Sequence, residues 1–408
     1  MSKNKLLVMM QRDPLGEGIG GMQTFIKGLI KCVPDEFEIE LVGISTDKLN
    51  RPVGKWKLIR FDNKEFNFFP VLYTNDQNRR TKIPLSLRFS LALFRYKSKI
   101  QLEDRILEFH RIEPAVIFRN VKNKKVLFIH GNVEELYNPY SEIKWSKIPW
   151  LYFKFEKRII PRMDRILVVS KEGLDFYKKK YSYMADKLSF VPTWADKSKF
   201  HPHSAKISRK KELLNLSGKF LISDEDRIIL FVGRLEGSKN PLLLIDSFHN
   251  ICISNKNVKL LIVGGGSLKE KVTRRIKKYK LENKVKLLGI FSQDRLAKLM
   301  RICDILVLTS ACEGMPRVVI EALSSGLPVV STDVGEVKRV VKDWHSGFLV
   351  SKHDAVDFAN AVTQILKNKE KFSLDNCLDS MKDYSMDIVL NSIYEEFRSL
   401  VNINKLAE

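Results

Sequence analysis

The chain has 408 residues, which is long enough for two domains of ordinary size that each bury a hydrophobic core. A hydrophobic content of 44% with only 14 prolines excludes a disordered or fibrous protein, and no apolar run reaches the roughly 18 residues of a membrane-spanning helix. The net charge of +23 is concentrated in residues 1–200, which carry 38 Lys and Arg against 23 Asp and Glu. This charge favours an anionic partner, which can be nucleic acid, an anionic membrane or a phosphorylated substrate.

The apolar run near the N-terminus covers only about five residues, so it predicts a first strand rather than a signal peptide. The five cysteines lack the paired short spacing of zinc and iron–sulfur ligands. We therefore expect reduced thiols in a cytoplasmic protein.

Short β-branched and leucine-rich runs alternate with longer amphipathic stretches, which predicts parallel βαβ units. In the first half, helices are expected to begin near Gly21, Gln101 and Glu172, and the predicted strands are 5–10, 37–44, 115–118, 126–130 and 165–169. A second series of predicted strands follows at 227–232, 258–263, 285–288, 305–308 and 328–331. Two series predict two sheets. The expected domains are 1–195, 196–380 and a helical segment, 381–408, that returns to the first domain.

A glycine-rich loop precedes the first predicted helix. Gly16, Gly18 and Gly21 satisfy the G-x-G-x-x-G pattern of a dinucleotide site, with an acidic residue about 20 positions further on. However, five residues (11–15) separate the strand from the first glycine, whereas the dinucleotide fingerprint turns directly off its strand. A flexible loop with Gly20 and Gly21 at the start of the helix is the better description.

His130 ends the predicted strand 126–130. A single histidine is most often structural, but a strand end in this class of sheet borders the ligand cleft.

The most informative motif is the segment from Glu313 to Glu321, which follows the predicted strand 305–308. Pro316 fits the first turn of a helix, because its missing N–H would lack a partner there. Glu313 stands just ahead of this helix and Glu321 lies inside it, so the two carboxylates can reach different hydroxyls of one ligand. The alternative makes them a loop charge and a solvated helix face.

Two further loops follow predicted strands of the second half. Gly233 to Pro241 carries Arg234 and Lys239, a pair suited to a diphosphate, although both can also be surface cations. Gly264, Gly265 and Gly266 allow backbone amides to approach a ligand closely, but a tight turn also needs glycine for its own geometry.

In this order, these motifs resemble glycosyltransferase family 4, the retaining GT-B-fold enzymes of cell-surface polysaccharide, lipopolysaccharide and glycolipid synthesis. The similarity covers nearly the whole chain, and its most specific element is the E-x7-E signature at Glu313 and Glu321. It implies an α/β fold of two Rossmann-like, doubly wound domains that face each other across a cleft.

The resemblance implies a nucleotide-sugar donor and assigns residues to it. Arg234 and Lys239 would neutralise the diphosphate, and Glu321 would bind the ribose. Glu313 would hold the transferred sugar with His130 beside it. The other implied donor-binding residues are Gly20, Gly21, Gly233, Gly265, Phe291, Gly314, Met315 and Pro316.

Two features bear on these expectations. The acidic triplet 224–226 precedes its strand and so lies at the wrong end of the sheet for a donor metal; we expect no metal or other cofactor. Residues 192–196 read Pro-Thr-Trp-Ala-Asp where the family usually has Asn-Gly after the proline, which leaves the conformation of the hinge open.

Residues 77–102 contain seven cations and no acid, interleaved with apolar residues. Such a segment suits an anionic membrane surface, and family members often sit there to reach lipid-linked acceptors; it also suits a core-packing helix with a solvated basic face. We therefore expect UDP- or GDP-sugar as donor, a glycan or lipid-linked acceptor, no nucleic acid, and peripheral attachment to the inner face of the membrane. The alternatives are a GT-B-fold sugar-nucleotide epimerase and an NAD-dependent oxidoreductase.

Overall fold

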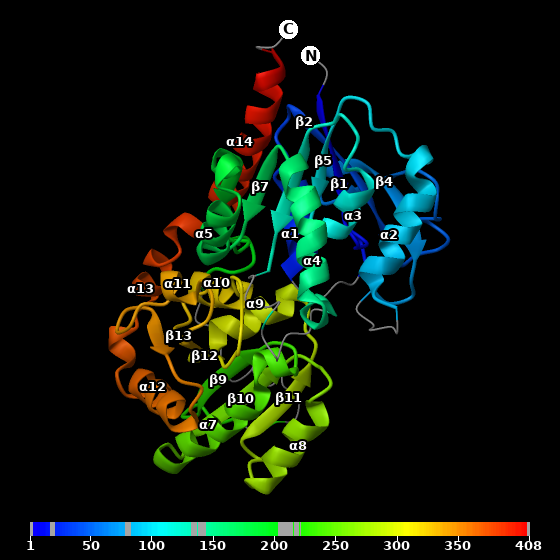
Figure 1. Cartoon of the computed structure of the whole chain (residues 1–408). Helices are drawn as coiled ribbons and strands as arrows, with labels where there is room; N and C mark the ends of the chain where they lie inside the picture. The colour runs from blue at the N-terminus through cyan, green and yellow to red at the C-terminus, as the bar shows by residue number, and fades with distance from the viewer. Residues whose placement is uncertain are drawn as a thin grey trace. The chain divides into compact units, whose positions relative to one another are not determined.

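The computed structural model describes residues 3–16, 21–77, 83–131, 137, 144–202, 215, 220 and 222–405 (Figure 1). The chain divides into two compact units. The first unit comprises residues 1–130, 148–191 and 387–408, and the second comprises residues 131–147 and 192–386. The division after Val191 falls four residues before the boundary expected from the sequence.

The first unit is built on a mostly parallel sheet with strand order β3-β4-β2-β1-β5-β6-β7-β8. Only the β3–β4 pair is antiparallel. Its elements are β1 (Asn4–Met9), α1 (Gly21–Lys31), β2 (Phe37–Ser45), β3 (Lys57–Phe61), β4 (Lys64–Tyr73), α2 (Leu85–Tyr96), β5 (Arg105–Phe109), α3 (Ile112–Ile117), β6 (Lys125–Ile129), α4 (Pro149–Ile159), β7 (Arg165–Val168), α5 (Lys171–Lys180), β8 (Leu188–Phe190) and α14 (Met386–Lys405).

Two elements predicted for this unit are wrong. The helix expected near Gln101 is absent from the described segment, and Arg105–Phe109 forms strand β5 instead. Residues 115–118, predicted as a strand, lie mostly in helix α3, where Pro114 occupies the first turn and needs no N–H partner. The charged residues of β5 made this buried strand hard to predict. Arg105 Nε donates to Glu40 Oε2 at 2.5 Å, so its charge is paired inside the sheet.

Helix α14 packs its apolar face on the first unit. Tyr394 Oη donates to the carbonyl oxygen of Leu29 at 2.7 Å, and Arg398 pairs with Glu36 at 2.6 Å. Arg165 of β7 pairs with Glu396 at 3.1 Å. These contacts fix the last helix to α1, to Glu36 just before β2, and to β7 of the first unit.

The second unit contains a parallel sheet with strand order β11-β10-β9-β12-β13-β14. Its elements are β9 (Arg227–Val232), α7 (Pro241–Ser254), β10 (Val258–Val263), α8 (Lys269–Lys278), β11 (Val285–Gly289), α9 (Gln293–Ile302), β12 (Ile305–Leu308), α10 (Arg317–Ser324), β13 (Val329–Thr332), α11 (Val337–Val340), β14 (Gly347–Val350), α12 (Ala355–Lys367) and α13 (Leu374–Asp379).

Helices cover both faces of this second sheet (Figure 1). Successive side chains of β9 point to opposite faces, so Ile228 and Leu230 join a core with α9, α10 and α11. Ile229 and Phe231 join a second core with α7, α8 and α12. Burial on both faces explains why these strands are continuous apolar runs, and the fold is the doubly wound α/β type predicted from the sequence.

Candidate active site

The candidate site begins where the second sheet reverses its strand order. From β9 the chain proceeds through α7 to β10 on one side, whereas β12 continues through α10 to β13 on the other. Ligands of open α/β sheets bind at the carboxyl ends of the strands beside such a switch point. The loops 233–240 and 309–316 therefore occupy the expected position.

Lys239 and Glu313 meet at this switch point. The Lys239 ammonium forms an ion pair with Glu313 Oε1, and Ser310 Oγ donates to the same oxygen at 2.6 Å. The loops that carry them are joined by backbone hydrogen bonds: the Ala311 amide donates to the Ser238 carbonyl at 2.8 Å. The structure thus brings together one predicted phosphate-binding cation and one predicted sugar-binding carboxylate. Arg234 stands exposed on the same loop.

Glycines bring neighbouring backbones close together around these loops. Gly264 has φ +140°, and a Cβ there would lie 1.9 Å from the Gly233 carbonyl oxygen. Gly335 has φ +52°, and its Cβ would lie 2.2 Å from the Gly314 oxygen. Both glycines are required by close backbone packing. For the 264–266 turn, the glycine at 264 thus serves the geometry of the turn itself. Gly265 differs, because a Cβ would meet only Ile290, at 3.8 Å.

Glu321 lies inside α10 and is buried, with 6% of its surface exposed, so the solvated helix face considered from the sequence is wrong. Burial raises the pKa of Glu321, although the Arg317 guanidinium 3.8 Å away opposes this shift. Pro316 is the N-cap of α10 rather than its first helical residue. Met315 and Gly314 are buried beside it.

Arg317 also contacts the segment that departs from the family pattern. Its Nη1 donates to Thr193 Oγ1 at 3.1 Å, and its guanidinium lies over the Trp194 ring at 5.4 Å. The Thr193 amide donates to Met315 Sδ at 3.4 Å. Residues 193 and 194 are thus held against the start of α10.

Phe291 follows β11 at the same edge of the second sheet and packs against the core on the α10 face. The Arg295 guanidinium covers its ring at 3.9 Å. The partner of this ring in the described structure is therefore a cation from the first turn of α9.

His130 directly follows β6, as predicted, and is partly exposed. Its Nε2 lies 2.8 Å from His110 Nδ1, and His110 Nε2 lies 2.9 Å from Glu108 Oε1. Glu108 is fully buried and His110 is 5% exposed. Burial raises the pKa of Glu108 to about 8, lowers that of His110 to about 3 and holds the pKa of His130 well below its usual range.

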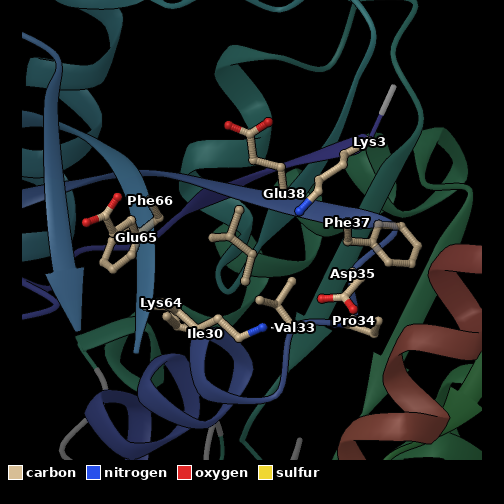
Figure 2. A pocket seen from close by; sticks show the side chains of 11 residues that line it. Lys3, Ile30, Val33, Pro34, Asp35, Phe37, Glu38, Lys64, Glu65 and Phe66 are labelled. Carbon is tan, nitrogen blue, oxygen red and sulfur yellow. Dashed lines mark hydrogen bonds between the residues drawn. The ribbon is translucent and has the colours of Figure 1, made fainter. Parts of the chain in front are cut away.

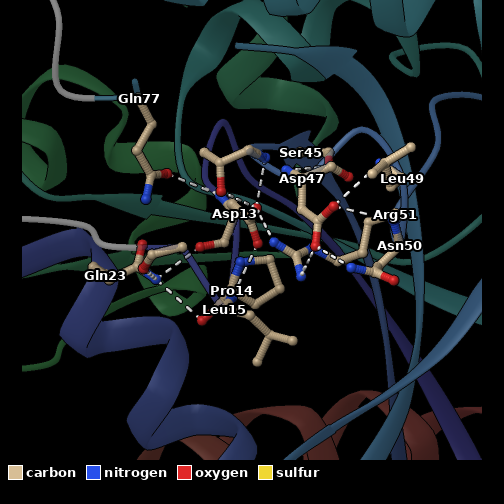
Figure 3. Close-up of polar contacts among 12 residues, drawn as sticks. Asp13, Pro14, Leu15, Gln23, Ser45, Asp47, Leu49, Asn50, Arg51 and Gln77 are labelled. Carbon is tan, nitrogen blue, oxygen red and sulfur yellow. Dashed lines mark hydrogen bonds and ion pairs between the residues drawn. The ribbon is translucent and has the colours of Figure 1, made fainter. Parts of the chain in front are cut away.

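Of the predicted glycine pair, Gly20 lies outside the described residues and Gly21 begins α1. Residues 11–16, the last described before this gap, are anchored by Asp13, which is fully buried and makes the polar contacts drawn in Figure 3. Asp13 Oδ2 accepts hydrogen bonds from Thr46 Oγ1 at 2.7 Å and from Arg51 Nη2 at 2.8 Å. Gln23 of α1 donates to the Asp13 carbonyl at 2.8 Å, so a buried polar cluster joins residues 13–16 to the start of α1.

A small cavity of about 90 Å³ lies elsewhere in the first unit (Figure 2). Lys3, Phe37 and Lys64 line it, near the amino ends of β1, β2 and β4. Ligand pockets usually measure about 300–1,000 Å³ and, in this class of sheet, lie at the carboxyl ends. This cavity therefore does not contribute to the candidate site.

Comparison with known proteins agrees with the geometry. Residues 215–376 match the family described as Glycosyl transferases group 1, and this range contains Arg234, Lys239, Glu313 and Glu321. An uncharacterized glycosyltransferase of Methanocaldococcus jannaschii is 30% identical over 270 residues, 63% of each chain. The N-acetylgalactosamine-N,N'-diacetylbacillosaminyl-diphospho-undecaprenol 4-alpha-N-acetylgalactosaminyltransferase of Campylobacter jejuni is 27% identical over 361 residues, 86% of this chain and 87% of the relative. The chain is similar to the group 1 glycosyltransferases.

Solved structures support the GT-B fold of this chain. Sucrose-phosphate synthase from Thermosynechococcus elongatus superposes with a TM-score of 0.77 at 19% identity, covering 98% of this chain and all of that one. Anabaena HepE in complex with UDP and glucose superposes with a TM-score of 0.71 at 15% identity, covering 96% of this chain and 99% of that one. The sequence matches are shorter: those to the M. jannaschii protein and three further relatives span between 46% and 63% of the relatives' length.

Sequence reasoning missed several residues that touch the candidate site residues. Arg317 lies four positions before Glu321, a spacing that places both on one helix face and was readable from the sequence. Glu108 lies in β5 and His110 directly follows it, two positions apart and therefore on the same side of the strand. This spacing was not noticed because a helix was predicted near Gln101. The match of residues 215–376 to the group 1 glycosyltransferases favours a transferase over the epimerase and the oxidoreductase considered as alternatives.

Proposed function

We propose that this chain moves a hexose-type sugar from a UDP- or GDP-sugar to a glycan or lipid-linked acceptor, with retention of configuration at the anomeric carbon. The observation that carries the proposal is the meeting of Lys239 and Glu313 at the switch point of the second sheet. A cation suited to phosphate and a carboxylate suited to hydroxyls lie together where the fold binds ligands.

The chemistry proposed is stabilisation of the leaving group. Negative charge grows on the diphosphate as its bond to the anomeric carbon breaks, and preorganised cations favour that state over the ground state. Lys239 and Arg234 supply these cations, and one such donor is worth about 3–4 kcal/mol of barrier. Because protein cations carry the charge, the proposal requires no metal.

The carboxylates and His130 orient the donor in this proposal. Glu321 binds the ribose hydroxyls, and Glu313 holds the transferred sugar with the backbone of residues 314–316. The contact between Glu313 and Lys239 also fixes the ammonium, which lowers the entropy lost when a phosphate binds. His130 lies beside the transferred sugar, and Phe291 lies near the base.

The comparisons support this proposal at a coarser level. The HepE structure, which shares the fold, is a complex with UDP and glucose. The C. jejuni relative is named for a diphospho-undecaprenol-linked substrate. These names motivate a nucleotide-sugar donor and a lipid-linked acceptor for this chain.

Thermal-shift titration with UDP-, GDP- and ADP-sugars tests the donor assignment, because a ligand that binds the folded state raises its apparent stability. We expect one nucleotide class to raise the melting temperature, and Glu321→Ala to abolish that shift. The exposed Lys298 of the same unit gives a control, Lys298→Ala, that should keep the shift. An unchanged shift in Glu321→Ala would remove the ribose assignment.

We further propose that helix α2 attaches the first unit to an anionic membrane surface. Phe89 and Leu93 of α2 are fully buried, whereas Leu87, Leu91 and Phe94 are 50%, 63% and 70% exposed. The exposed apolar residues recur at helical spacing, and the exposed Arg95 lies beside them. The helix therefore packs on the unit with one face and presents an apolar face with a cation. No helix in the described part of the chain is long and apolar enough to cross a bilayer.

Flotation with liposomes tests this attachment. Vesicles that contain anionic lipid should recover the protein, neutral vesicles should recover less, and Leu91→Glu should abolish the difference. Ile253→Glu is a matched control, because Ile253 is 75% exposed on α7 of the second unit. Equal recovery of Leu91→Glu and the wild type would contradict the role of α2.

A further inference from the structure

One oxygen of the Glu313 carboxylate has two polar partners of different kinds. The Lys239 ammonium forms an ion pair with Oε1, and the Ser310 hydroxyl donates to the same Oε1 at 2.6 Å. An ionised carboxylate only accepts hydrogen bonds, so the hydroxyl is the donor in the second contact. Among the residues that the structure describes, Glu313 Oε2 has no hydrogen-bond partner, and 11% of the side chain is exposed. The carboxylate is thus held through one oxygen and leaves the other to a ligand.

The backbone around Ser310 is anchored on two sides. Thr332 Oγ1, at the end of β13, donates to the Ser310 carbonyl oxygen at 2.7 Å. The amide of the next residue, Ala311, donates to the Ser238 carbonyl in the loop after β9 at 2.8 Å. Ser310 and Thr332 are fully buried. The Ser310 hydroxyl is therefore carried by a fixed point of the main chain.

The backbone of Glu313 is held by the turn after β13. Gly335 has φ +52° and lies so close that a Cβ there would stand 2.4 Å from the Glu313 carbonyl oxygen. The Glu336 amide donates to the Gly314 carbonyl at 2.9 Å. With the main chain fixed, only the side-chain torsions of Glu313 remain to be set. The Ser310 hydroxyl, three residues earlier, restricts these torsions because it holds Oε1.

The two partners of Oε1 differ in what else they bind. Lys239 is a cation on a flexible four-carbon stem, and in the proposed function it also meets the diphosphate. An ammonium that turns towards phosphate oxygens holds Glu313 less closely. Ser310 is neutral and buried, so it does not compete for the phosphate. The hydroxyl is the partner that keeps Oε1 in place while the cation serves the leaving group.

We propose that Ser310 is a positioning residue, which orients the Glu313 carboxylate for the transferred sugar when Lys239 engages the diphosphate. The hydroxyl holds Oε1, and Oε2 accepts a hydrogen bond from a sugar hydroxyl. This inference rests on the proposed function, in which Glu313 holds the transferred sugar. A carboxylate that is ordered in advance loses less entropy when the sugar binds.

A pair of ligands tests this role, because Glu313 is assigned to the sugar and not to the diphosphate. The nucleotide sugar that thermal-shift titration selects and its nucleoside diphosphate, UDP for a UDP-sugar or GDP for a GDP-sugar, are each titrated in a calorimeter. Ser310→Ala should raise the Kd of the nucleotide sugar about tenfold and leave the Kd of the nucleoside diphosphate near that of the wild type. An unchanged Kd of the nucleotide sugar, or an equal loss for both ligands, would overturn the proposal.

Ser346→Ala is a matched control for the loss of a buried hydroxyl. Ser346 is fully buried in the second unit, and its Oγ donates to the Val340 carbonyl at 3.0 Å. It directly precedes β14, so it lies at the amino ends of the parallel strands, away from the loop 309–316. Ser346→Ala should leave the Kd of both ligands near the wild type. A loss of nucleotide-sugar affinity equal to that of Ser310→Ala would contradict a specific role of Ser310.

A double-mutant cycle with Glu313→Ala tests whether Ser310 acts through Glu313. In the Glu313→Ala background, Ser310→Ala should not raise the Kd of the nucleotide sugar further, and a further loss of similar size would overturn the positioning role. Chemical denaturation of the same four proteins without ligand measures the contact itself. Ser310→Ala should shift the unfolding midpoint less when Glu313 is already replaced, and equal shifts in the two backgrounds would contradict the contact.

Glu313→Ala also separates this inference from the proposed function. If Glu313→Ala leaves the Kd of the nucleotide sugar unchanged, the assignment of Glu313 to the sugar fails, and the ligand-free cycle alone shows whether Ser310 holds the carboxylate. If Glu313→Ala weakens binding of the nucleotide sugar but Ser310→Ala does not, the positioning inference alone fails.

Discussion

Lys239 forms an ion pair with Glu313, 74 residues further along the chain. The loops that carry the two residues are tied together, because Thr309 Oγ1, after β12, donates to the Lys239 carbonyl, after β9, at 3.0 Å. Each side chain therefore holds the other in place. Removal of one leaves the charge of its partner unpaired and its position less firmly fixed.

Lys239→Ala should slow sugar transfer by about 10²–10³-fold, because it removes a preorganised cation from the proposed diphosphate site. Steady-state kinetics with the selected nucleotide sugar measures this loss. Lys298→Ala removes an exposed lysine from the same unit and should leave the rate near that of the wild type. A Lys239→Ala rate within a factor of ten of the wild type would contradict the assignment of Lys239 to the leaving group.

Arg317→Met should destabilise the second unit by about 2–3 kcal/mol, because the buried Glu321 loses its cation. The expected cost is at the lower end for a buried pair, since the two groups are 3.8 Å apart. Chemical denaturation followed by a probe in the second unit measures it. Adding Glu321→Gln to Arg317→Met should recover part of the loss, because no unpaired carboxylate then remains; additive losses would show that the two side chains do not interact.

Asp13→Asn should destabilise the first unit by about 1–3 kcal/mol, since the amide cannot accept all the hydrogen bonds that the fully buried carboxylate accepts (Figure 3). Asp47 offers a matched control, because it also pairs with Arg51, at 3.6 Å, but is partly exposed. The unfolding midpoint of Asp47→Asn should lie close to that of the wild type. Equal unfolding midpoints for the two variants would show that burial of Asp13 adds nothing to the stability of the first unit.

The fold of the second unit could be predicted from its strands. Residues 227–232, 258–263 and 305–308 were expected as strands and form β9, β10 and β12 with those bounds. They are buried on both faces, so each reads as an unbroken apolar run with at most one charge at or near its start. The positions of the motifs at the strand ends followed from these runs.

The first unit was harder to predict because its buried strands contain charges. Arg105 and Glu108 made β5 read as a helix, and the partner that neutralises Arg105 is Glu40, 65 residues away. Such long-range pairing is not encoded in any local pattern. For the same reason the contact of Arg317 with Thr193, across 124 residues, was not foreseen, although the departure of residues 192–196 from the family pattern was.

Glu108→Gln should change how stability depends on pH. The pKa of Glu108 is about 8 in the folded chain and ordinarily 4.5, so between these values the unfolded chain releases a proton that the folded chain keeps. This group therefore makes the folded state less stable as pH rises from 4.5 to 8. His110, whose pKa falls from 6.5 to about 3, acts in the opposite direction: its contribution is lost as pH falls below 6.5.

Substitution of Glu108 by glutamine removes the pH dependence of stability that is due to Glu108 and leaves that due to His110. The melting temperature of Glu108→Gln should thus lie near that of the wild type at pH 5 and exceed it by several degrees at pH 8, with the difference growing through the interval. Thermal unfolding at unit steps of pH measures this. Glu65→Gln, at an exposed position of the same unit, should follow the wild-type curve. Parallel curves for Glu108→Gln and the wild type would mean that Glu108 is already ionised in the folded protein.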